Sequence, residues 1–243
     1  MRKFGLIGYP LTHSFSKKFF EEKFQRENIT GCSYELFELR TIEELPALLA
    51  ANPELAGLNV TIPYKEKVLP YLHWLSDDAK AIGAVNCIKW NNGIMEGWNT
   101  DAYGFEISLK NFLDRQPEQA FILGTGGSSK AIEFVLKQIK MPFIKVSQQQ
   151  KEAAIDYRGI APLMKQSNLF INTTPVGMFP NTQEAPEIPY SKLSANDFLF
   201  DLVYNPTETE FLKRGKANGA KTQNGLDMLE LQAEKSWEIW NSQ

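Results

Sequence analysis

Apolar runs alternate with amphipathic segments along the first part of the chain. This pattern predicts strands near residues 3–7, 33–38 and 56–61, with helices near residues 15–28 and 42–50 between them. Strands and helices in this order are typical of βαβ units, whose strands pair in parallel. The first part of the chain is therefore expected to contain parallel strand pairs.

A hairpin is predicted to interrupt this rhythm. The segments 86–90 and 94–98 flank Asn91-Asn-Gly93, and an Asn-Gly pair between strands is a strong signal for a tight turn. Two helices are predicted before the hairpin, near residues 64–72 and 76–82. The first sheet is thus expected to include an antiparallel pair.

The alternation resumes further along the chain. A helix is predicted from Asp101 to about Asp114, and the residues after it are expected to connect into a new sheet. Its strands are predicted near residues 119–123, 142–147, 168–172 and 197–202. This order fits a compact version of the mononucleotide-binding half of a Rossmann fold.

The last predicted helix runs from about residue 226 to residue 240. Apolar side chains recur along it at helical spacing, at Leu226, Leu229, Ala233, Trp237 and Trp240. Periodicity alone does not choose the partner of this stripe, and we expect the helix to return to the first domain. The predicted fold class is α/β, with an N-terminal substrate domain of residues 1–101 plus 225–243 and a C-terminal Rossmann-like, dinucleotide-binding domain of residues 102–224.

Composition narrows the possible partners. The 243 residues are 43% hydrophobic, which is enough for two moderate cores, and the net charge is −3. No basic excess points to nucleic acid or to an anionic membrane surface, so a small molecule is the expected partner. The first residues form too short an apolar run for a signal peptide, and no stretch nears the ~20 residues that span a bilayer.

Only two cysteines occur, Cys32 and Cys87. They are too few for a disulfide framework and are not spaced as a metal or redox pair, so both are expected to be buried free thiols. A cytoplasmic protein is expected. No metal site is predicted, and a hydrolytic triad is improbable because His13 and His73 are the only histidines and no Gly-x-Ser-x-Gly elbow exists.

A glycine-rich turn follows one of the predicted strands, in the sequence Phe121-Ile-Leu-Gly-Thr-Gly-Gly-Ser-Ser-Lys-Ala131. Gly124 and Gly126 permit a tight turn, Gly127 permits close backbone approach, and the amides that open the next helix can hold a pyrophosphate. Such a turn can also serve an ordinary sharp loop. With a strand before it and a helix after it, the turn favours dinucleotide binding.

A second group of polar residues ends an apolar strand, in Leu58-Asn-Val-Thr-Ile-Pro-Tyr-Lys65. Ligands of open α/β sheets collect outside the carboxyl ends of strands, so Asn59, Thr61 and Lys65 are expected to face a pocket. The alternative is an ordinary helix start near Pro63 with Lys65 in solvent. Taken alone, the segment does not choose between the two.

Together with these segments, further motifs make the chain resemble the shikimate dehydrogenase family over nearly all of its length. The motifs are Gly8-Tyr-Pro-Leu-Thr-His-Ser-Phe-Ser16, Asn59-Val-Thr-Ile-Pro-Tyr-Lys65, Gly83-Ala-Val-Asn86, Asn99-Thr-Asp101, the glycine turn, Asn172-Thr-Thr-Pro-Val-Gly-Met178, Asp201-Leu-Val-Tyr-Asn-Pro206 and Asn224-Gly-Leu-Asp-Met228 through Gln232. The resemblance implies interconversion of 3-dehydroshikimate and shikimate.

The resemblance also implies roles for polar residues. Ser14 and Ser16 are similar to the hydroxyls that hold the substrate carboxylate, and the residues similar to those that contact the rest of the substrate are Thr61, Asn86, Asp101, Tyr204 and Gln232. A site lined with such groups rejects analogues that leave them unpaired. For Ser14 and Ser16, a turn or capping role is an equal alternative.

Lys65 and Asp101 are the expected catalytic residues. Lys65 is similar to the family's catalytic lysine, and reducing a ketone requires a proton for the developing alkoxide. The ammonium group could instead act as an electrostatic clamp while water delivers the proton. Neighbouring Lys67 matches no motif and is expected to be solvated.

The cofactor is expected to be NADP, with NAD possible. The predicted cofactor residues are Gly124, Thr125, Gly126, Gly127, Ser128, Ser129, Ser147, Gln148, Val203 and Gly225. NADP-using relatives carry Asn-Arg-Thr and a further arginine after the second Rossmann strand, whereas this chain has Ser147-Gln-Gln-Gln-Lys151. An acidic residue that would indicate NAD is absent as well. Ser147, Gln148 and Lys151 are left to bind the 2′-phosphate, more weakly than arginines would.

Two other functions stay open at this point. One is a relative that acts on another substrate, such as quinate, with NAD; the other is an inactive binding protein on the same scaffold. The presence of Lys65 and Asp101 within their motifs argues against the inactive form. A monomer or a homodimer is expected.

Overall fold

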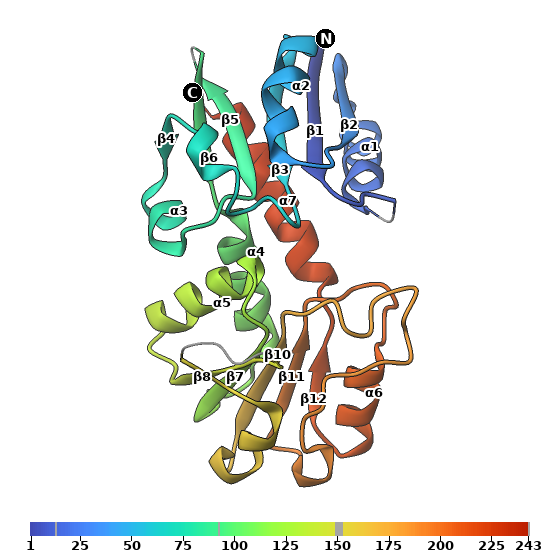
Figure 1. The fold of residues 1–243 in the computed structure, drawn as a ribbon. Helices are drawn as coiled ribbons and strands as arrows, with labels where there is room; N and C mark the ends of the chain where they lie inside the picture. Colours follow the sequence, from blue (N-terminus) through green and yellow to red (C-terminus); the bar gives the residue numbers. More distant parts are fainter. Residues whose placement is uncertain (13, 92, 149–152, 243) are drawn as a thin grey trace. The chain divides into compact units, whose positions relative to one another are not determined.

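Figure 1 shows the computed structural model, which describes residues 1–12, 14–91, 93–148 and 153–242. The chain forms two compact units. Unit 1 comprises Met1–Thr100 and Gln232–Gln243, and unit 2 comprises Asp101–Leu231. Within the described ranges, no helix is both long enough and apolar enough to cross a membrane. Asn92, in the predicted hairpin turn, and Lys151, a predicted phosphate ligand, lie outside the described residues.

A mixed sheet with the order β2-β1-β3-β5-β6-β4 forms the centre of unit 1. The strands are β1 Arg2–Gly8, β2 Cys32–Glu38, β3 Leu55–Val60, β4 Trp74–Leu75, β5 Cys87–Asn91 and β6 Ile94–Trp98. β1 pairs in parallel with β2 and β3, whereas β5 is antiparallel to both β3 and β6. The predicted parallel pairs and the hairpin are both confirmed.

Three helices of unit 1 lie close to their predicted positions. They are α1 Ser16–Arg26, α2 Leu45–Ala51 after the 3-10 turn Ile42–Glu44, and α3 Asp77–Ile82. The start of α3 is fixed by Ser76, whose Oγ accepts a hydrogen bond from the amide of Ala79 at 3.1 Å. Its end is fixed by Gly83 at φ +70°, a left-handed conformation that suits glycine.

The helix predicted over residues 64–72 is wrong. Only the 3-10 helix Leu69–Tyr71 forms there, after a series of turns. The carbonyl of Lys65, which a helix would pair with residue 69, accepts instead from the amide of Val85 at 2.7 Å. Pro70 has no amide proton and disfavours a helical conformation at the residue before it. A tertiary contact and a proline together replace the helix.

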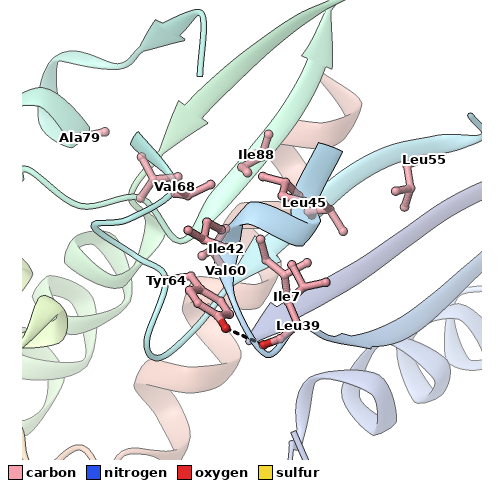
Figure 2. Packing of buried hydrophobic residues seen from close by; sticks show 12 residues of the cluster. Ile7, Leu39, Ile42, Leu45, Leu55, Val60, Tyr64, Val68, Ala79 and Ile88 are labelled. Atoms are coloured by element: carbon pink, nitrogen blue, oxygen red, sulfur yellow. Dashed lines mark hydrogen bonds between the residues drawn. The ribbon is translucent and has the colours of Figure 1, made fainter. Parts of the chain in front are cut away.

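An apolar cluster anchors this segment of turns to unit 1. Figure 2 shows Tyr64 within the cluster beside Ile42 and Val60, and its hydroxyl donates a hydrogen bond to the carbonyl of Leu39 at 2.5 Å. Tyr64 is only 1% exposed. The residue directly before Lys65 is therefore held in the core.

The helix α7, Leu226–Asn241, begins in unit 2 and belongs to unit 1 from Gln232 onward. Trp240 donates its Nε1 proton to the carbonyl of Ile88 at 2.9 Å, and its ring stacks on Phe4 with the centroids 4.8 Å apart. A Cβ atom on Gly57 would lie 2.4 Å from the Trp240 ring, so glycine permits this close packing. The predicted return of the C-terminal helix is confirmed.

The two cysteines differ in their surroundings. Cys87 lies in the core, where burial raises the pKa of its thiol to about 12. Cys32 is only half-buried, so the prediction that both are buried is wrong for this residue. Cys32 opens the outer strand β2, which among the described residues has a neighbouring strand on one side only and is therefore less covered. Both cysteines are free thiols.

Unit 2 contains a sheet in which every strand pairing is parallel, with the order β12-β11-β10-β7-β8-β9 in the described residues. The strands are β7 Gln119–Leu123, β8 Phe143–Val146, β9 Ala154–Ile155, β10 Asn168–Asn172, β11 Phe198–Asp201 and β12 Lys221–Gln223. The chain crosses from one side of β7 to the other after β9, which makes this a doubly wound sheet. The predicted Rossmann-like unit is confirmed.

Helices cover both faces of this sheet. They are α4 Thr100–Phe112, α5 Gly127–Gln138 and α6 Glu210–Ala217. Phe112 of α4 packs edge-on against Phe198 of β11 with the centroids 5.7 Å apart, whereas the adjacent Leu199 packs against Gly215 of α6. Because successive strand residues point to opposite faces, α4 and α6 lie on opposite sides of β11.

Candidate active site

Four neighbouring strands of the unit 1 sheet begin or end at the same edge. β1 and β3 are parallel and both end at this edge, whereas the antiparallel β5 begins there and β6 ends there. The backbone joins them: the amide of Thr61 donates to the carbonyl of Ile7 at 2.9 Å, and the amide of Val60 donates to the carbonyl of Asn86 at 2.9 Å. Strand order thus brings the predicted substrate residues Thr61 and Asn86 to one edge.

Asn86 and Gln232 are connected by a buried hydrogen-bond network. Asn86 accepts at Oδ1 from the amide of Thr100 at 2.7 Å, and its Nδ2 donates to Oε1 of Gln232 at 3.3 Å. A backbone amide can only donate, so the contact with Thr100 fixes which end of the Asn86 amide is the oxygen. The two predicted residues are therefore neighbours with defined orientations.

Ser236 extends this network and was missed by the sequence reasoning. Its Oγ donates to the carbonyl of Gln232 at 2.9 Å and lies 3.1 Å from Oγ1 of Thr100. Ser236 and Thr100 are 0% and 1% exposed, respectively. The sequence did contain a signal for Ser236, which lies four residues before Trp240 on the apolar face of the predicted helix. A hydroxyl that is buried on such a face needs a hydrogen-bond partner.

Asn59 does not face a pocket, and that prediction is wrong. It is 5% exposed, accepts at Oδ1 from the hydroxyl of Tyr34 at 2.8 Å and donates from Nδ2 to Ser236 Oγ at 2.9 Å. Its side chain thus satisfies buried polar groups in unit 1. Burial raises the pKa of Tyr34 well above its ordinary value, against the effect of a hydrogen bond with Ser16.

Ser14 and Ser16 lie at the start of α1, in the segment that follows β1. The amide of Ser16 donates to Oγ of Ser14 at 3.3 Å, and both side chains are half-buried. Part of the turn role considered for these residues is therefore present. The amide of Leu11 in the same segment donates to Oε1 of Glu38 at 2.6 Å, which ties the segment to the end of β2.

Lys65 is held by its backbone on both sides. Its carbonyl accepts from Val85, and the preceding Tyr64 is buried in the core. The side chain of Lys65 is half-buried, whereas that of Lys67 is exposed, as predicted for the lysine without a motif. Asp101 is buried and lies in the first turn of α4, directly after Thr100 of the Asn86 network.

The glycine-rich turn of unit 2 lies between β7 and α5. Gly124 adopts φ +118°, and a Cβ atom on it would lie 2.6 Å from Oγ1 of Thr173, which follows β10. Gly126 precedes α5 at φ −85°, and a Cβ atom on it would meet nothing within 4 Å. Ser129 donates from Oγ to the carbonyl of Gly126 at 2.6 Å, which closes the turn. The turn thus offers an open backbone surface at a helix start, which fits a pyrophosphate.

The other predicted cofactor residues follow neighbouring strands at the same edge of the sheet. Ser147 follows β8, and its amide donates to the carbonyl of Ile155 at 2.9 Å, while Gln148 beside it is exposed. Val203 follows β11 and accepts at its carbonyl from the amide of Gly225, after β12, at 3.2 Å. A Cβ atom on Gly225 would lie 2.2 Å from the carbonyl oxygen of Leu202, so only glycine fits. Tyr204 is half-buried beside Val203.

Unit 2 is a doubly wound sheet with a glycine turn at its carboxyl edge, and unit 1 is a mixed α/β unit with buried amides and hydroxyls at one edge of its sheet. Together in one chain, these features define the class of two-domain dinucleotide-dependent oxidoreductases. Residues 6–88 match the family model described as shikimate dehydrogenase substrate binding domain. The shikimate dehydrogenase (NADP(+)) of Caldanaerobacter subterraneus subsp. tengcongensis is 37% identical, with 99% of this chain and 91% of that protein covered. The chain belongs to the shikimate dehydrogenase family.

Solved structures agree with this assignment. Shikimate dehydrogenase 1 from Peptoclostridium difficile matches with a TM-score of 0.84 and 38% identity, over 99% of this chain and 92% of that one. The Thermus thermophilus shikimate 5-dehydrogenase, solved with NADP(H) and shikimate, matches with a TM-score of 0.83 and 29% identity, over 99% and 94% of the two chains. The family prediction made from the motifs is confirmed.

Proposed function

We propose that this protein is a shikimate dehydrogenase, which catalyses the reversible NADPH-linked reduction of 3-dehydroshikimate to shikimate in the biosynthesis of chorismate and aromatic amino acids. The observation that carries the proposal is the contact between Asn86 and Gln232, which come from positions 146 residues apart. Both were expected as substrate ligands, and the fold brings their amides together at one edge of unit 1.

The substrate is proposed to bind through the polar side chains at this edge. Ser14 and Ser16, at the start of α1, suit a carboxylate because hydroxyls donate hydrogen bonds to it. The ring hydroxyls are assigned to Thr61, Asn86, Asp101 and Gln232, and Tyr204 of unit 2 is assigned to the substrate side. Because Oδ1 of Asn86 accepts from the amide of Thr100, the group that Asn86 offers to the substrate is its Nδ2 donor, which in this structure donates to Oγ1 of Thr100 and Oε1 of Gln232.

Lys65 and Asp101 are proposed to carry the proton chemistry. Reduction of the ketone creates an alkoxide, and the ammonium group of Lys65 donates the proton or stabilises the charge. The fixed backbone around Lys65 supports this role, because both the buried Tyr64 before it and the bond from Val85 limit its movement. Asp101 is proposed to orient the ammonium group and a substrate hydroxyl.

NADP is proposed as the cofactor and, when bound, supplies or accepts the hydride. The glycine turn from Gly124 to Ser129 fits its pyrophosphate, because the space beside Gly126 is empty and a ligand placed there can approach the backbone. Val203 and Gly225 are assigned to the nicotinamide end, and Ser147 and Gln148 to the adenosine end. Residues 147–151 include no arginine, so the 2′-phosphate of NADP would be bound by weaker donors such as Ser147 and Gln148. NAD, which lacks this phosphate, is therefore the competing cofactor.

The test is absorbance of reduced nicotinamide with purified protein, shikimate and either NADP or NAD. Growth of the band with NADP supports the proposal, and growth with NAD alone would replace the proposed cofactor. Quinate, which has an added hydroxyl and a saturated ring, is the matched alternative substrate. A higher kcat/KM for quinate than for shikimate would overturn the proposed substrate.

The setting of the enzyme is proposed as the cytoplasm. Two free cysteines suit a reducing compartment. A monomer or a homodimer is proposed for the active form. Light scattering coupled to size-exclusion chromatography decides between the two.

A further inference from the structure

Unit 2 contains two buried Asn–Asp pairs at opposite ends of the same two strands. At the carboxyl ends of β10 and β11, Asn172 donates from Nδ2 to Oδ1 of Asp201 at 2.9 Å. At the amino ends, Asn168 donates from Nδ2 to Oδ1 of Asp197 at 2.7 Å. All four side chains are between 0% and 2% exposed. Only the first pair lies at the edge of the sheet that carries the predicted cofactor residues.

The carboxylate of Asp201 holds the segment that follows β11. Its Oδ1 also accepts from the amide of Val203 at 3.0 Å, and its Oδ2 accepts from the hydroxyl of Thr209 at 2.6 Å. The carbonyl of Val203 in turn accepts from the amide of Gly225. One side chain therefore fixes, directly or through a single further bond, both residues assigned to the nicotinamide end.

Asn172 extends the same arrangement to the segment after β10. Its Oδ1 accepts from the amide of Thr174 at 3.1 Å and from the hydroxyl of Thr174 at 2.6 Å. Thr173 and Thr174 are the residues that a Cβ atom on Gly124 would touch. The pair thus connects the loops after β10, β11 and β12 by hydrogen bonds.

We propose that Asp201 is a positioning residue whose carboxylate sets the loops that hold the nicotinamide end of the dinucleotide. The inference rests on the proposed function, because the assignment of Val203 and Gly225 to the nicotinamide comes with it. Three donors converge on the carboxylate, from Asn172, Val203 and Thr209. Buried donors that lose their acceptor rearrange to find another, so removing the carboxylate displaces the loops.

The opposite pair provides a matched control. Asp197 accepts from Asn168 and from both the amide and the hydroxyl of Ser194, and it is as deeply buried as Asp201. No predicted cofactor residue contacts it among the described residues. Asp197→Ala therefore creates a comparable structural defect in the same two strands, away from the cofactor edge.

The experiment compares wild type, Asp201→Ala, Asp201→Asn and Asp197→Ala in three measurements. These are kcat for shikimate oxidation, NADPH affinity by fluorescence titration, and the melting temperature. For Asp201→Ala we expect kcat to fall about tenfold or more, because small displacements of reacting atoms are costly. NADPH affinity should stay within about threefold, since the glycine turn of α5 holds the pyrophosphate.

Asp201→Asn is expected to keep kcat within about threefold of wild type, because the amide still accepts from Val203 and can donate to the hydroxyl of Thr209. Asp197→Ala is expected to lower the melting temperature and leave kcat unchanged. Equal losses of kcat in Asp201→Ala and Asp197→Ala would overturn the proposal, as would an Asp201→Asn variant as slow as the alanine variant.

A second pair of variants keeps the test decisive should Asp201→Ala not fold. Thr209→Val removes one donor to the carboxylate while keeping the shape of the side chain, and Thr209→Ser keeps the hydroxyl. A kcat lower in the valine variant than in the serine variant supports the proposal, and equal values contradict it. Failure of the proposed function is seen separately, in a wild-type protein that does not turn over shikimate.

Discussion

The Nδ2 atom of Asn86 lies 3.3 Å from Oε1 of Gln232, although 146 residues separate the two in sequence. Asn86 directly precedes β5, and Gln232 lies on α7, whose residues from this point onward pack in unit 1. The apolar contacts of Trp240 and Trp237 with Phe4 hold this part of α7 on the sheet. The C-terminal helix thus has a second role besides packing, because it contributes Gln232 to the proposed substrate site.

Gln232→Ala should weaken substrate binding more than turnover. The substitution removes a polar partner of a substrate hydroxyl and one of the acceptors of Asn86 Nδ2, which keeps its bond to Oγ1 of Thr100, so we expect KM for shikimate to rise about tenfold or more. The measurement is steady-state kinetics at saturating NADP. Glu238→Gln, an exposed position on the same helix, is the control and should leave KM unchanged. An unchanged KM in Gln232→Ala would remove Gln232 from the site.

Thr100→Val should disturb Asn86 without touching the proposed substrate. The hydroxyl of Thr100 donates to Oδ1 of Asn86 at 3.2 Å and lies 3.1 Å from Oγ of Ser236. Losing it removes hydrogen bonds from Asn86 and Ser236, whose polar atoms keep other partners, so the free energy of unfolding should fall by about 0.5–1.5 kcal/mol for each lost bond. KM for shikimate should rise by less than in Gln232→Ala, because the backbone amide of residue 100 still donates to Oδ1 of Asn86 and keeps its orientation. Urea denaturation and kinetics check both effects, and Thr100→Ser, which keeps the hydroxyl, should behave like wild type.

Lys65→Ala should lower kcat by a factor of about 10² to 10⁴, the usual contribution of a positioned acid or base. Lys67→Ala, at an exposed position two residues away, should retain wild-type kcat. Lys65→Arg separates the two roles considered for the lysine. A guanidinium keeps the positive charge but does not release a proton in proteins, so substantial activity in this variant supports the electrostatic clamp. Its loss supports proton donation.

Gly126→Ala should separate cofactor binding from stability. Gly126 has φ −85°, which alanine adopts without strain, and no protein atom lies within 4 Å of a Cβ placed there. The melting temperature should therefore stay close to that of wild type, whereas the added methyl group occupies the space assigned to the pyrophosphate, so NADPH affinity should fall. Fluorescence titration measures the affinity, and unchanged affinity would move the pyrophosphate away from this turn.

The contrasting substitution is Gly124→Ala. Here φ is +118° and the new Cβ would lie 2.6 Å from Oγ1 of Thr173. The backbone conformation and the contact both oppose alanine, so this variant should lose stability as well as affinity. If both glycine variants melt like wild type, the turn is looser than its geometry indicates.

Local signals were sufficient for most of the fold. The hairpin of β5 and β6 followed from the Asn-Gly turn, and the strands β7, β8, β10 and β11 of unit 2 followed from short apolar runs bounded by turn residues. The short outer strands β9 and β12 were not predicted. The predicted helix over residues 64–72 failed because its hydrogen bonds are decided elsewhere. Val85 takes the carbonyl of Lys65, a contact between chain segments that no local pattern contains.

The proposed site was predictable where a residue directly follows or precedes a strand. Thr61 and Gly124 are such residues, and strand order brings them to the edges of their sheets, whereas Asn86 and Gln232 were expected only from the family's motifs. Asn59 lies within β3, which is buried along most of its length, so nothing in the sequence shows which way its side chain points. Tyr34 and Ser236 were missed because their importance comes from contacting Asn59 rather than from a motif.

The pH dependence of stability should carry a signature of Asp201. Burial raises the pKa of this carboxyl from 3.8 to about 6, against the opposing hydrogen bonds from Thr209, Val203 and Asn172. Between these two values the folded state binds more protons than the unfolded state, so the free energy of unfolding falls as the pH rises. A separation of about two pKa units corresponds to about 3 kcal/mol for this group alone.

Other carboxylates oppose this trend: burial raises the pKa of Glu133, but its hydrogen-bonded ion pairs with Lys137 and Lys145 outweigh burial and lower that pKa, so this group stabilises the fold at higher pH. The contribution of Asp201 is therefore isolated as the difference in unfolding free energy between wild type and Asp201→Asn, measured by urea denaturation at pH 4 to 8. An amide does not ionise, so the unfolding free energy of Asp201→Asn should increase relative to that of wild type as the pH rises toward 6, and the difference should then level off. A difference that is constant with pH would mean that the Asp201 carboxyl titrates alike in the folded and unfolded chains.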